Sequence, residues 1–291
     1  MNLLTFDIED WYHINYPVVD FTVFDQQEDH QALFDRTKKL TEYCKTRGIQ
    51  GTFFVLGRIL EKRPEIGEWI VEQGQELALH GFEHDLLTQK SPDSFKVELE
   101  RSMEAFRRIT GTPPLGYRAP SWSITAANLW ILETLDSFGF TYDASFFPVK
   151  NFLYGLPSAP SEPFYPLIGG RQLSLLEVPV SIVKLGPRRI AYSGGIYFNL
   201  WPFMIIRKLA ARQSNQGKPN LFYFHPWDLW KRSPDQCRRL KAARWVTIHL
   251  GDALLKFERL LDAFPMGSIA ANLESLKRRA RPALLGSIHE S

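Results

Sequence analysis

The first half of the chain repeats one pattern, in which a short apolar run is followed by a segment with helical periodicity. The three pairs of candidate strand and helix are 3–7 with 33–44, 52–56 with 64–73, and 76–79 with 91–110. Pro64 and Pro92 stand where helices begin, and a glycine follows each helix end. Repeated strand–helix units predict parallel strands with helices packed outside them and functional groups at the carboxyl ends of the strands. The simplest fold is therefore α/β, one domain of the β/α-barrel type.

The pattern changes after Ser145, where five prolines between 148 and 166 interrupt a segment without clear periodicity. A linker between two domains is one interpretation. We prefer a packed surface loop, because the segment is rich in Phe and Tyr and aromatic loops often form the walls of a substrate cleft. Beyond it we expect strands at 173–180 and 221–224, a turn or lid at 193–198, and an amphipathic helix at 252–264.

The composition excludes several classes of protein. A hydrophobic content of 44% and an aromatic content of 13% describe a globular domain with a substantial core. A net charge of +3 gives no reason to expect a nucleic-acid partner. Cys44 and Cys237 stand far apart without a CxxC motif, which argues against a disulfide framework and a thiolate metal site.

No window of the sequence holds the roughly 18 apolar residues needed for a membrane span. The first residues lack the basic start, the long apolar stretch and the cleavage site of a signal peptide. We therefore expect a cytoplasmic protein, with peripheral contact to the inner face of the membrane as an open alternative. That alternative rests on residues 200–208, where large apolar side chains precede Arg and Lys, although a core helix is our first interpretation.

Two of the candidate strands are followed by residues that could bind a metal, three acids after the first and two histidines after the third. His80 and His84 are four residues apart, so that a coiled segment directs both rings one way and allows them to bind a divalent metal. Alone, this spacing more often belongs to solvated or capping histidines. Asp7, Glu9 and Asp10 crowd the end of the first strand, where a helix N-terminus is the alternative interpretation. Crowded carboxylates repel one another unless a cation holds them together, and a metal near the histidines would be that cation.

Two further strand ends carry groups suited to acid–base chemistry. Arg118 is predicted to pair with one of the acids and keep it ionised and oriented, the alternative being a surface arginine. His225 follows the apolar run 221–224, and its reference pKa near neutrality suits proton transfer. A single histidine at such a position is more often structural. The arrangement shared with the other strand ends favours the catalytic interpretation.

Taken in chain order, these motifs resemble those of the polysaccharide deacetylase family, carbohydrate esterase family 4. Its members are metal-dependent esterases that include chitooligosaccharide and peptidoglycan deacetylases. The motifs concerned are 6–10, 80–84, 118–122 and 224–226. Segments that resemble the branch associated with bacterial exopolysaccharide and exosortase systems are 117–120, 154–157, 177–181, 193–198 and 222–227. The resemblance implies a distorted (β/α) barrel of about seven parallel strands in a single domain. It covers residues 1–265, which we take as the catalytic domain, and leaves 266–291 as a basic C-terminal tail.

The resemblance also implies roles for individual residues. Asp7 matches the general base of the family, and His225 matches the general acid. Arg118 matches the arginine that steers the base. His80 and His84 match the metal-binding histidines, for which zinc is the default ion and cobalt or manganese would fit similar ligands.

Two assignments within the resemblance stay open. The third metal ligand of the family is an acid just after the base, and here it is Glu9 or Asp10. Alternation along a strand favours Glu9, whereas a turn after Asp7 favours Asp10. The carboxylate that orients the acid histidine is displaced from its usual place, and the candidates are Glu177 and Asp143.

The expected activity is hydrolysis of an N-acetyl group on an amino sugar of a bacterial surface or exopolysaccharide precursor. The partner would be an N-acetylated sugar or a lipid-linked oligosaccharide. Four aromatic residues are candidates for stacking on sugar rings: Trp122, Tyr154, Tyr197 and Trp227. The same apparatus also suits a formyl group, an O-acetyl ester or a non-sugar amide, and an inactive carbohydrate-binding protein is the alternative from another class.

Overall fold

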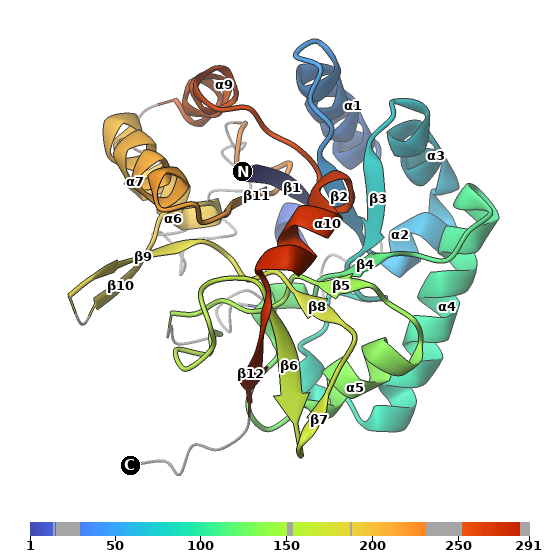
Figure 1. The fold of residues 1–291 in the computed structure, drawn as a ribbon. Helices are drawn as coiled ribbons and strands as arrows, with labels where there is room; N and C mark the ends of the chain where they lie inside the picture. Colours follow the sequence, from blue (N-terminus) through green and yellow to red (C-terminus); the bar gives the residue numbers. More distant parts are fainter. Residues whose placement is uncertain (14, 16–29, 150–153, 187, 231–251, 286–291) are drawn as a thin grey trace.

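Seven neighbouring strands run parallel to one another through the centre of the computed structural model (Figure 1). In order along the sheet they are β11 (Asn220–Phe224), β1 (Asn2–Ile8), β2 (Thr52–Val55), β3 (Glu76–Leu79), β4 (Gly116–Tyr117), β5 (Tyr142–Asp143) and β8 (Leu176–Glu177). Every residue of β1, β2, β3 and β11 is buried, as is typical of parallel strands covered on both faces. The structure describes residues 1–13, 15, 30–149, 154–186, 188–230 and 252–285, and Cys237 lies outside these ranges.

The register of the strands brings the predicted functional residues to one edge of the sheet. The last pair between β1 and β11 directly precedes Asp7 and His225. The single pair between β3 and β4 directly precedes His80 and Arg118. Parallel strands therefore deliver four of the predicted side chains to their common carboxyl edge.

Helices cover the outside of the strands in the first half of the chain (Figure 1). They are α1 (Gln31–Lys45), α2 (Gly57–Lys62), α3 (Pro64–Glu72), α4 (Pro92–Thr110) and α5 (Trp130–Ser137). In α4, a capping box between Ser91 and Ser94 satisfies the first N–H groups, and Gly111 ends the helix with φ 72°. The strand–helix alternation predicted for this half is confirmed.

The second half adds less regular elements. Strand β6 (Phe164–Ile168) runs antiparallel to β8 and to β7 (Arg171–Gln172), so the segment expected to be a loop contains a strand. Strands β9 (Ile182–Leu185) and β10 (Arg188–Ala191) form a separate hairpin. The expected turn or lid at 193–198 is largely helix α6 (Gly195–Leu200), followed by α7 (Phe203–Asn215). Helix α9 (Ala253–Ala263) fulfils the amphipathic pattern at 252–264.

The C-terminal segment corrects our expectation of a basic tail. Helix α10 (Ile269–Arg279) crosses the amino ends of the central strands, and β12 (Arg281–Leu284) pairs in parallel with β6 (Figure 1). Ile269 and Leu276 have no exposed surface. The basic residues that suggested a tail occupy the last turn of α10, where cations are favoured by the helix dipole. The helix thus carries its basic residues at its end and packs its apolar face into the core.

The fold is thus the predicted α/β single domain, with one difference in its closure. The sheet curls as a half-barrel and continues through antiparallel β6 to β12. No pairing joins β11 to β12 within the described residues. Among the described helices, none combines the length and the apolar character needed to span a bilayer.

Candidate active site

Three side chains with metal-binding atoms converge at the carboxyl edge of the sheet. Glu9 follows β1, and His80 and His84 follow β3; all three are buried, and their ligand atoms lie within 4.8 Å of one another. Nε2 of His80 is 3.6 Å from Oε2 of Glu9, and Nε2 of His84 approaches the same oxygen. Burial raises the pKa of Glu9, but the charge of His84 and hydrogen bonds from both histidines outweigh it, so the pKa falls well below its usual range.

The contacts of the two rings show how they are held. Nδ1 of His80 lies 3.0 Å from the carbonyl oxygen of Arg118, which only accepts, so Nδ1 donates the hydrogen bond. The protonated ring can donate from Nε2 to Glu9, whereas in the neutral ring Nε2 directs a lone pair toward that carboxylate, and a cation between them would then stabilise the arrangement. The amide of Asn15 donates to the carbonyl of His84 at 2.7 Å and lies 3.2 Å from its Nδ1. Sequence analysis did not identify Asn15.

A glycine allows the backbone to turn sharply between His80 and His84. Gly81 has φ +78°, a backbone conformation that L side chains rarely adopt. A Cβ atom at this position would also lie 3.0 Å from Cγ of Pro120. The chain therefore turns directly after β3 and places the second histidine over the first.

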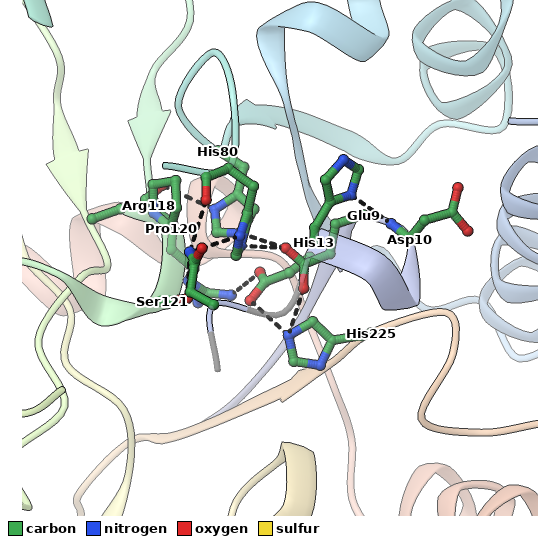
Figure 2. A network of polar contacts seen from close by, with 12 residues as sticks. Glu9, Asp10, His13, His80, Arg118, Pro120, Ser121 and His225 are labelled. Atoms are coloured by element: carbon green, nitrogen blue, oxygen red, sulfur yellow. Dashed lines mark hydrogen bonds and ion pairs between the residues drawn. The ribbon is translucent and has the colours of Figure 1, made fainter. Parts of the chain in front are cut away.

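The structure separates the two candidates for the third ligand. Glu9 is directed between His80 and His225, whereas Asp10 points to the opposite side (Figure 2). Oδ2 of Asp10 accepts a hydrogen bond from the Tyr12 hydroxyl at 3.2 Å and lies 3.4 Å from Nδ1 of His30. The geometry thus supports Glu9 and places Asp10 outside the histidine cluster.

Asp7 and Arg118 form a buried ion pair beside this cluster. Nη1 of Arg118 donates to Oδ1 of Asp7 at 2.5 Å and to the hydroxyl of Thr5 at 3.0 Å. Its Nε donates to the carbonyl of Ala144 at 3.1 Å, and the guanidinium lies over the ring of Phe54. Arg118 has no exposed surface, so its guanidinium is held in a fixed orientation against Asp7. The predicted pairing of Arg118 with one of the acids is confirmed.

His225 completes the group from β11, the parallel neighbour of β1. Its Nε2 lies 3.8 Å from Oδ2 of Asp7 and 3.5 Å from Oε1 of Glu9 (Figure 2). Its Nδ1 lies 2.7 Å from Oδ2 of Asp228, which also accepts the backbone N–H of His225 at 3.1 Å. Burial lowers the pKa of His225, but the charge and hydrogen bond of Asp228, with Glu9 and Asp7, raise it to about 9 overall.

The carboxylate beside His225 corrects our expectation of Glu177 or Asp143. Those two residues are cross-strand partners on β8 and β5, and both are fully buried. Asp143 accepts a hydrogen bond from the hydroxyl of Ser145, and Glu177 accepts the backbone N–H of Phe146. The carboxylate that lies beside Nδ1 of His225 is that of Asp228. A sequence signal was present, because an acid three residues after a histidine reaches back to that ring across a turn.

A pocket opens over these groups, and three of the four predicted sugar-binding aromatics line it. They are Trp122, Tyr154 and Trp227. The ring of Trp227 stacks on His225 with centroids 4.5 Å apart and an interplanar angle of 15°. Tyr223 also lines the pocket, a residue that sequence analysis did not single out.

Tyr197 does not line this pocket. Its ring stacks on Phe147 at 5.6 Å and faces a separate apolar groove. Helix α6 lies between the two features, because Gly195 and Ile196 line the pocket whereas Tyr197 and Leu200 line the groove.

The wall formed by Ser121 and Trp122 has a strained backbone. Their φ angles are +49° and +53°, in the left-handed region that residues with side chains rarely adopt. Both residues line the pocket. Strain of this kind persists only where the surroundings enforce it, and such positions cluster at functional sites.

Two family models match the chain. Residues 19–142 match the model described as polysaccharide deacetylase. Residues 144–274 match a model described as a domain of unknown function, DUF3473. The boundary between the two matches coincides with the change from regular strand–helix units to the irregular second half.

Several curated proteins resemble the first part of the chain. A peptidoglycan deacetylase-like protein, FGM2, of Gibberella zeae is 32% identical over 141 residues, which cover 45% of this chain and 41% of that protein. The peptidoglycan-N-acetylmuramic acid deacetylase PdaA of Bacillus subtilis is 27% identical over 128 residues, which cover 37% of this chain and 48% of that protein. The chain thus spans less than half the length of these relatives. Family model and relatives together support the polysaccharide deacetylase family.

Solved structures confirm the fold. A candidate polysaccharide deacetylase of Mycobacterium smegmatis superposes with a TM-score of 0.61 and 20% identity, covering 99% of this chain and 94% of that one. An allantoinase superposes with a TM-score of 0.60 and 12% identity, covering 95% and 88%. At these identities the likeness concerns the fold alone.

Proposed function

We propose that this protein is a metal-dependent hydrolase that removes N-acetyl groups from an amino sugar. The observation that carries the proposal is the meeting of three components in one pocket: a metal-binding cluster, a carboxylate held by an arginine, and a histidine held by a second carboxylate. The match of residues 19–142 to the polysaccharide deacetylase model supports the same activity.

Glu9, His80 and His84 would hold the ion. Two imidazoles and one carboxylate leave coordination positions open, as in catalytic zinc sites, and cobalt or manganese would suit the same donors. When bound there, the ion would polarise an acyl carbonyl and lower the pKa of a bound water. The buried carboxylate of Glu9 facing the lone pair of His80 fits such a cation.

Asp7 would act as the general base. Arg118 holds one of its oxygens, and the other faces the pocket. This arrangement fixes the carboxylate and directs its free oxygen at a water that attacks the acyl carbon. The proton taken from that water passes to Asp7.

His225 would act as the general acid. Asp228 accepts a hydrogen bond from the Nδ1–H group, which leaves the Nε2 proton directed into the pocket. The stacked ring of Trp227 limits rotation of the imidazole. As the amide C–N bond breaks, Nε2 protonates the leaving amine, and the products are acetate and a free amino sugar.

The finer assignment concerns the sugar. Trp122, Tyr154 and Trp227 line the pocket, and aromatic side chains are common in carbohydrate sites. We propose a bacterial surface or exopolysaccharide precursor, free or lipid-linked, as the substrate, and the cytoplasm as the place of reaction. The segments that resemble the exopolysaccharide and exosortase branch support this choice.

A second candidate keeps the site and changes the substrate. The superposition with an allantoinase shows that this fold also serves an enzyme of a different name and substrate. A formyl group, an O-acetyl ester or a non-sugar amide would meet the same base, acid and metal-binding cluster.

Metal analysis and acetate release across a panel of N-acetylated sugars test the proposal. The purified protein is expected to bind about one equivalent of zinc per chain and to release acetate from at least one N-acetylated oligosaccharide. The Asp7→Asn variant should lose turnover and retain the metal. Normal hydrolysis by that variant would refute the mechanism, and a metal-free protein that binds sugar without releasing acetate would show the carbohydrate-binding alternative.

A further inference from the structure

Residues 181–220 have an unusual charge distribution. They contain seven Lys and Arg residues and no Asp or Glu, in a chain whose net charge is only +3. The remainder of the chain is therefore net negative. The seven cations are Lys184, Arg188, Arg189, Arg207, Lys208, Arg212 and Lys218.

Large apolar side chains are exposed among these cations. On the β9–β10 hairpin, Leu185 is 42% exposed, and on α7, Met204 is 54% and Ile205 is 37% exposed. Leu200, at the end of α6, is 36% exposed. We define the basic apolar surface as Lys184, Leu185, Arg188, Leu200, Met204, Ile205, Arg207 and Lys208.

The elements that carry this surface lie together on one side of the molecule, where the hairpin projects from the body (Figure 1). Nε1 of Trp201 donates to the carbonyl of Ala191, which ties the start of α7 to β10. Gln213 of α7 donates to the carbonyl of Ile182 on β9. The hairpin and the two helices therefore form one connected unit.

Most of these cations form no ion pair with another described residue. Lys218 pairs with Glu162, and Arg189 donates to two backbone carbonyls. Within the described residues, the ion pairs include none of the other five: Lys184, Arg188, Arg207, Lys208 and Arg212. Free cations around exposed apolar side chains form a surface complementary to an anionic, partly apolar partner.

We infer that the basic apolar surface docks onto an anionic lipid bilayer. Interfacial membrane binding combines insertion of apolar side chains with attraction of Lys and Arg to acidic headgroups, and this surface supplies both. A second copy of the chain is a poor occupant, because a two-fold contact would bring like charges together. A nucleic acid is also a poor occupant, because its charged backbone would gain nothing from exposed Met204, Ile205 and Leu185.

Docking would place the pocket beside the bilayer. Helix α6 joins the two, since its first residues, Gly195 and Ile196, line the pocket and its last residue, Leu200, belongs to the basic apolar surface. A substrate whose sugar is attached to a membrane lipid would then reach the pocket without leaving the membrane. This consequence rests on the proposed function, whereas docking itself does not.

Vesicle co-sedimentation of the full chain tests the inference. Vesicles of phosphatidylcholine with about one third phosphatidylglycerol should bind the protein, and vesicles of phosphatidylcholine alone should not. The double variant Met204→Glu/Lys208→Glu should bind the anionic vesicles at least about tenfold more weakly. Both side chains are exposed on α7, so the fold should be unaffected.

The matched control is Lys96→Glu/Val97→Glu on α4, on the far side of the sheet (Figure 1). It also replaces one exposed cation and one exposed apolar side chain, and it should retain wild-type binding. Absence of binding to anionic vesicles, or equal weakening by both double variants, would overturn the inference. A wild-type dimer detected by light scattering, and dissociated by the α7 variant but not by the control, would also overturn the inference.

Acetate release from a water-soluble oligosaccharide separates this inference from the proposed function. The α7 variant should hydrolyse the soluble substrate at the wild-type rate. Lipid binding without any hydrolysis would refute the proposed function alone. Hydrolysis without lipid binding would refute docking alone.

Discussion

Two pairs of buried acids lie at the carboxyl ends of strands in this protein, and they are held in different ways. Asp7 and Glu9, at the end of β1, face cationic or metal-binding groups: Arg118 beside the first, and His80 and His84 beside the second. Asp143 and Glu177 face each other across β5 and β8. Their other close contacts are mainly with hydroxyl and backbone donors.

The contrast shows that partners, not burial, decide which acids carry charge. Burial raises the pKa of Asp143 to about 6, and burial together with the charge of Asp143 raises the pKa of Glu177 well above its usual range. In Glu9 the same burial is outweighed by histidines, and its pKa falls. The raised pKa values therefore disfavour the charged forms of Asp143 and Glu177, whereas the lowered pKa of Glu9 favours its carboxylate.

The largest expected effect comes from removing the buried counter-charge of Asp7. Arg118→Met leaves Asp7 buried without its cation, which should lower the free energy of unfolding by about 3–5 kcal/mol and abolish acetate release. Urea unfolding monitored by tryptophan fluorescence measures the stability. The control Arg101→Met removes an arginine that is 51% exposed and paired with Glu61, and should cost less than about 1 kcal/mol. Equal losses for both variants would contradict the contrast.

The next effect distinguishes the two acids that follow Asp7. Glu9→Gln should weaken zinc binding at least about 100-fold, because it removes a charged ligand from the cluster. Asp10→Asn should change it by only a few-fold, since Asp10 faces Tyr12 and His30. Competition with a chromogenic chelator measures both affinities. A larger loss in the Asp10 variant would move the third ligand to Asp10.

A smaller effect concerns the carboxylate beside His225. Asp228→Asn should lower kcat roughly 10- to 100-fold with little change in KM, because Asp228 orients the His225 ring through its contact with Nδ1. The zinc content should stay the same. Asp143→Asn, at a residue first considered for this role, should lower kcat less. The reverse order would restore Asp143 as the orienting group.

The smallest effect is the pH dependence of stability from the inner pair. Because its folded-state pKa values are raised, the pair contributes stability at low pH that is lost as the pH rises through those values. Glu177→Gln removes one titrating group. The free energy of unfolding of the variant minus that of the wild type should therefore increase by on the order of 1–3 kcal/mol from pH 4 to pH 8. Urea midpoints across this range measure the change. Glu162→Gln, at an acid 52% exposed, should give a flat difference, and a similarly flat result for Glu177 would show that the pair is ionised throughout.

The first half of the fold was predictable because its physics is local. Apolar periodicity, Pro at helix starts and Gly at helix ends marked the strand–helix units, and the strand ends then located Asp7, His80, Arg118 and His225. The choice between Glu9 and Asp10 was not predictable, because it depends on a turn in which the N–H of Glu9 bonds to the carbonyl of Asp7. From the sequence, alternation along a strand favoured Glu9, whereas a tight turn favoured Asp10.

The second half was harder to predict because its contacts are long-range. Strand β6 contains a proline and pairs antiparallel with only one residue of β8, so it has little signature in the sequence. The apolar face of α10 was present as Ile269, Leu273 and Leu276, with Ser268 as its N-cap. The run of basic residues at its end hid it, which shows that charge alone does not mark a tail.

Helix α10 also determines when the domain can finish folding. The N–H of Ile269 donates to Thr52, 217 residues earlier, and the N–H of Ala270 donates to Glu76, 194 residues earlier. Gly267 bridges to Leu3 of the first strand. During synthesis, the amino ends of β1, β2 and β3 therefore wait for almost the whole chain to emerge. A polypeptide that stops at residue 265 would leave the Glu76 carboxyl without the backbone donor of Ala270, so we expect the nascent chain to depend on chaperones until these last contacts form.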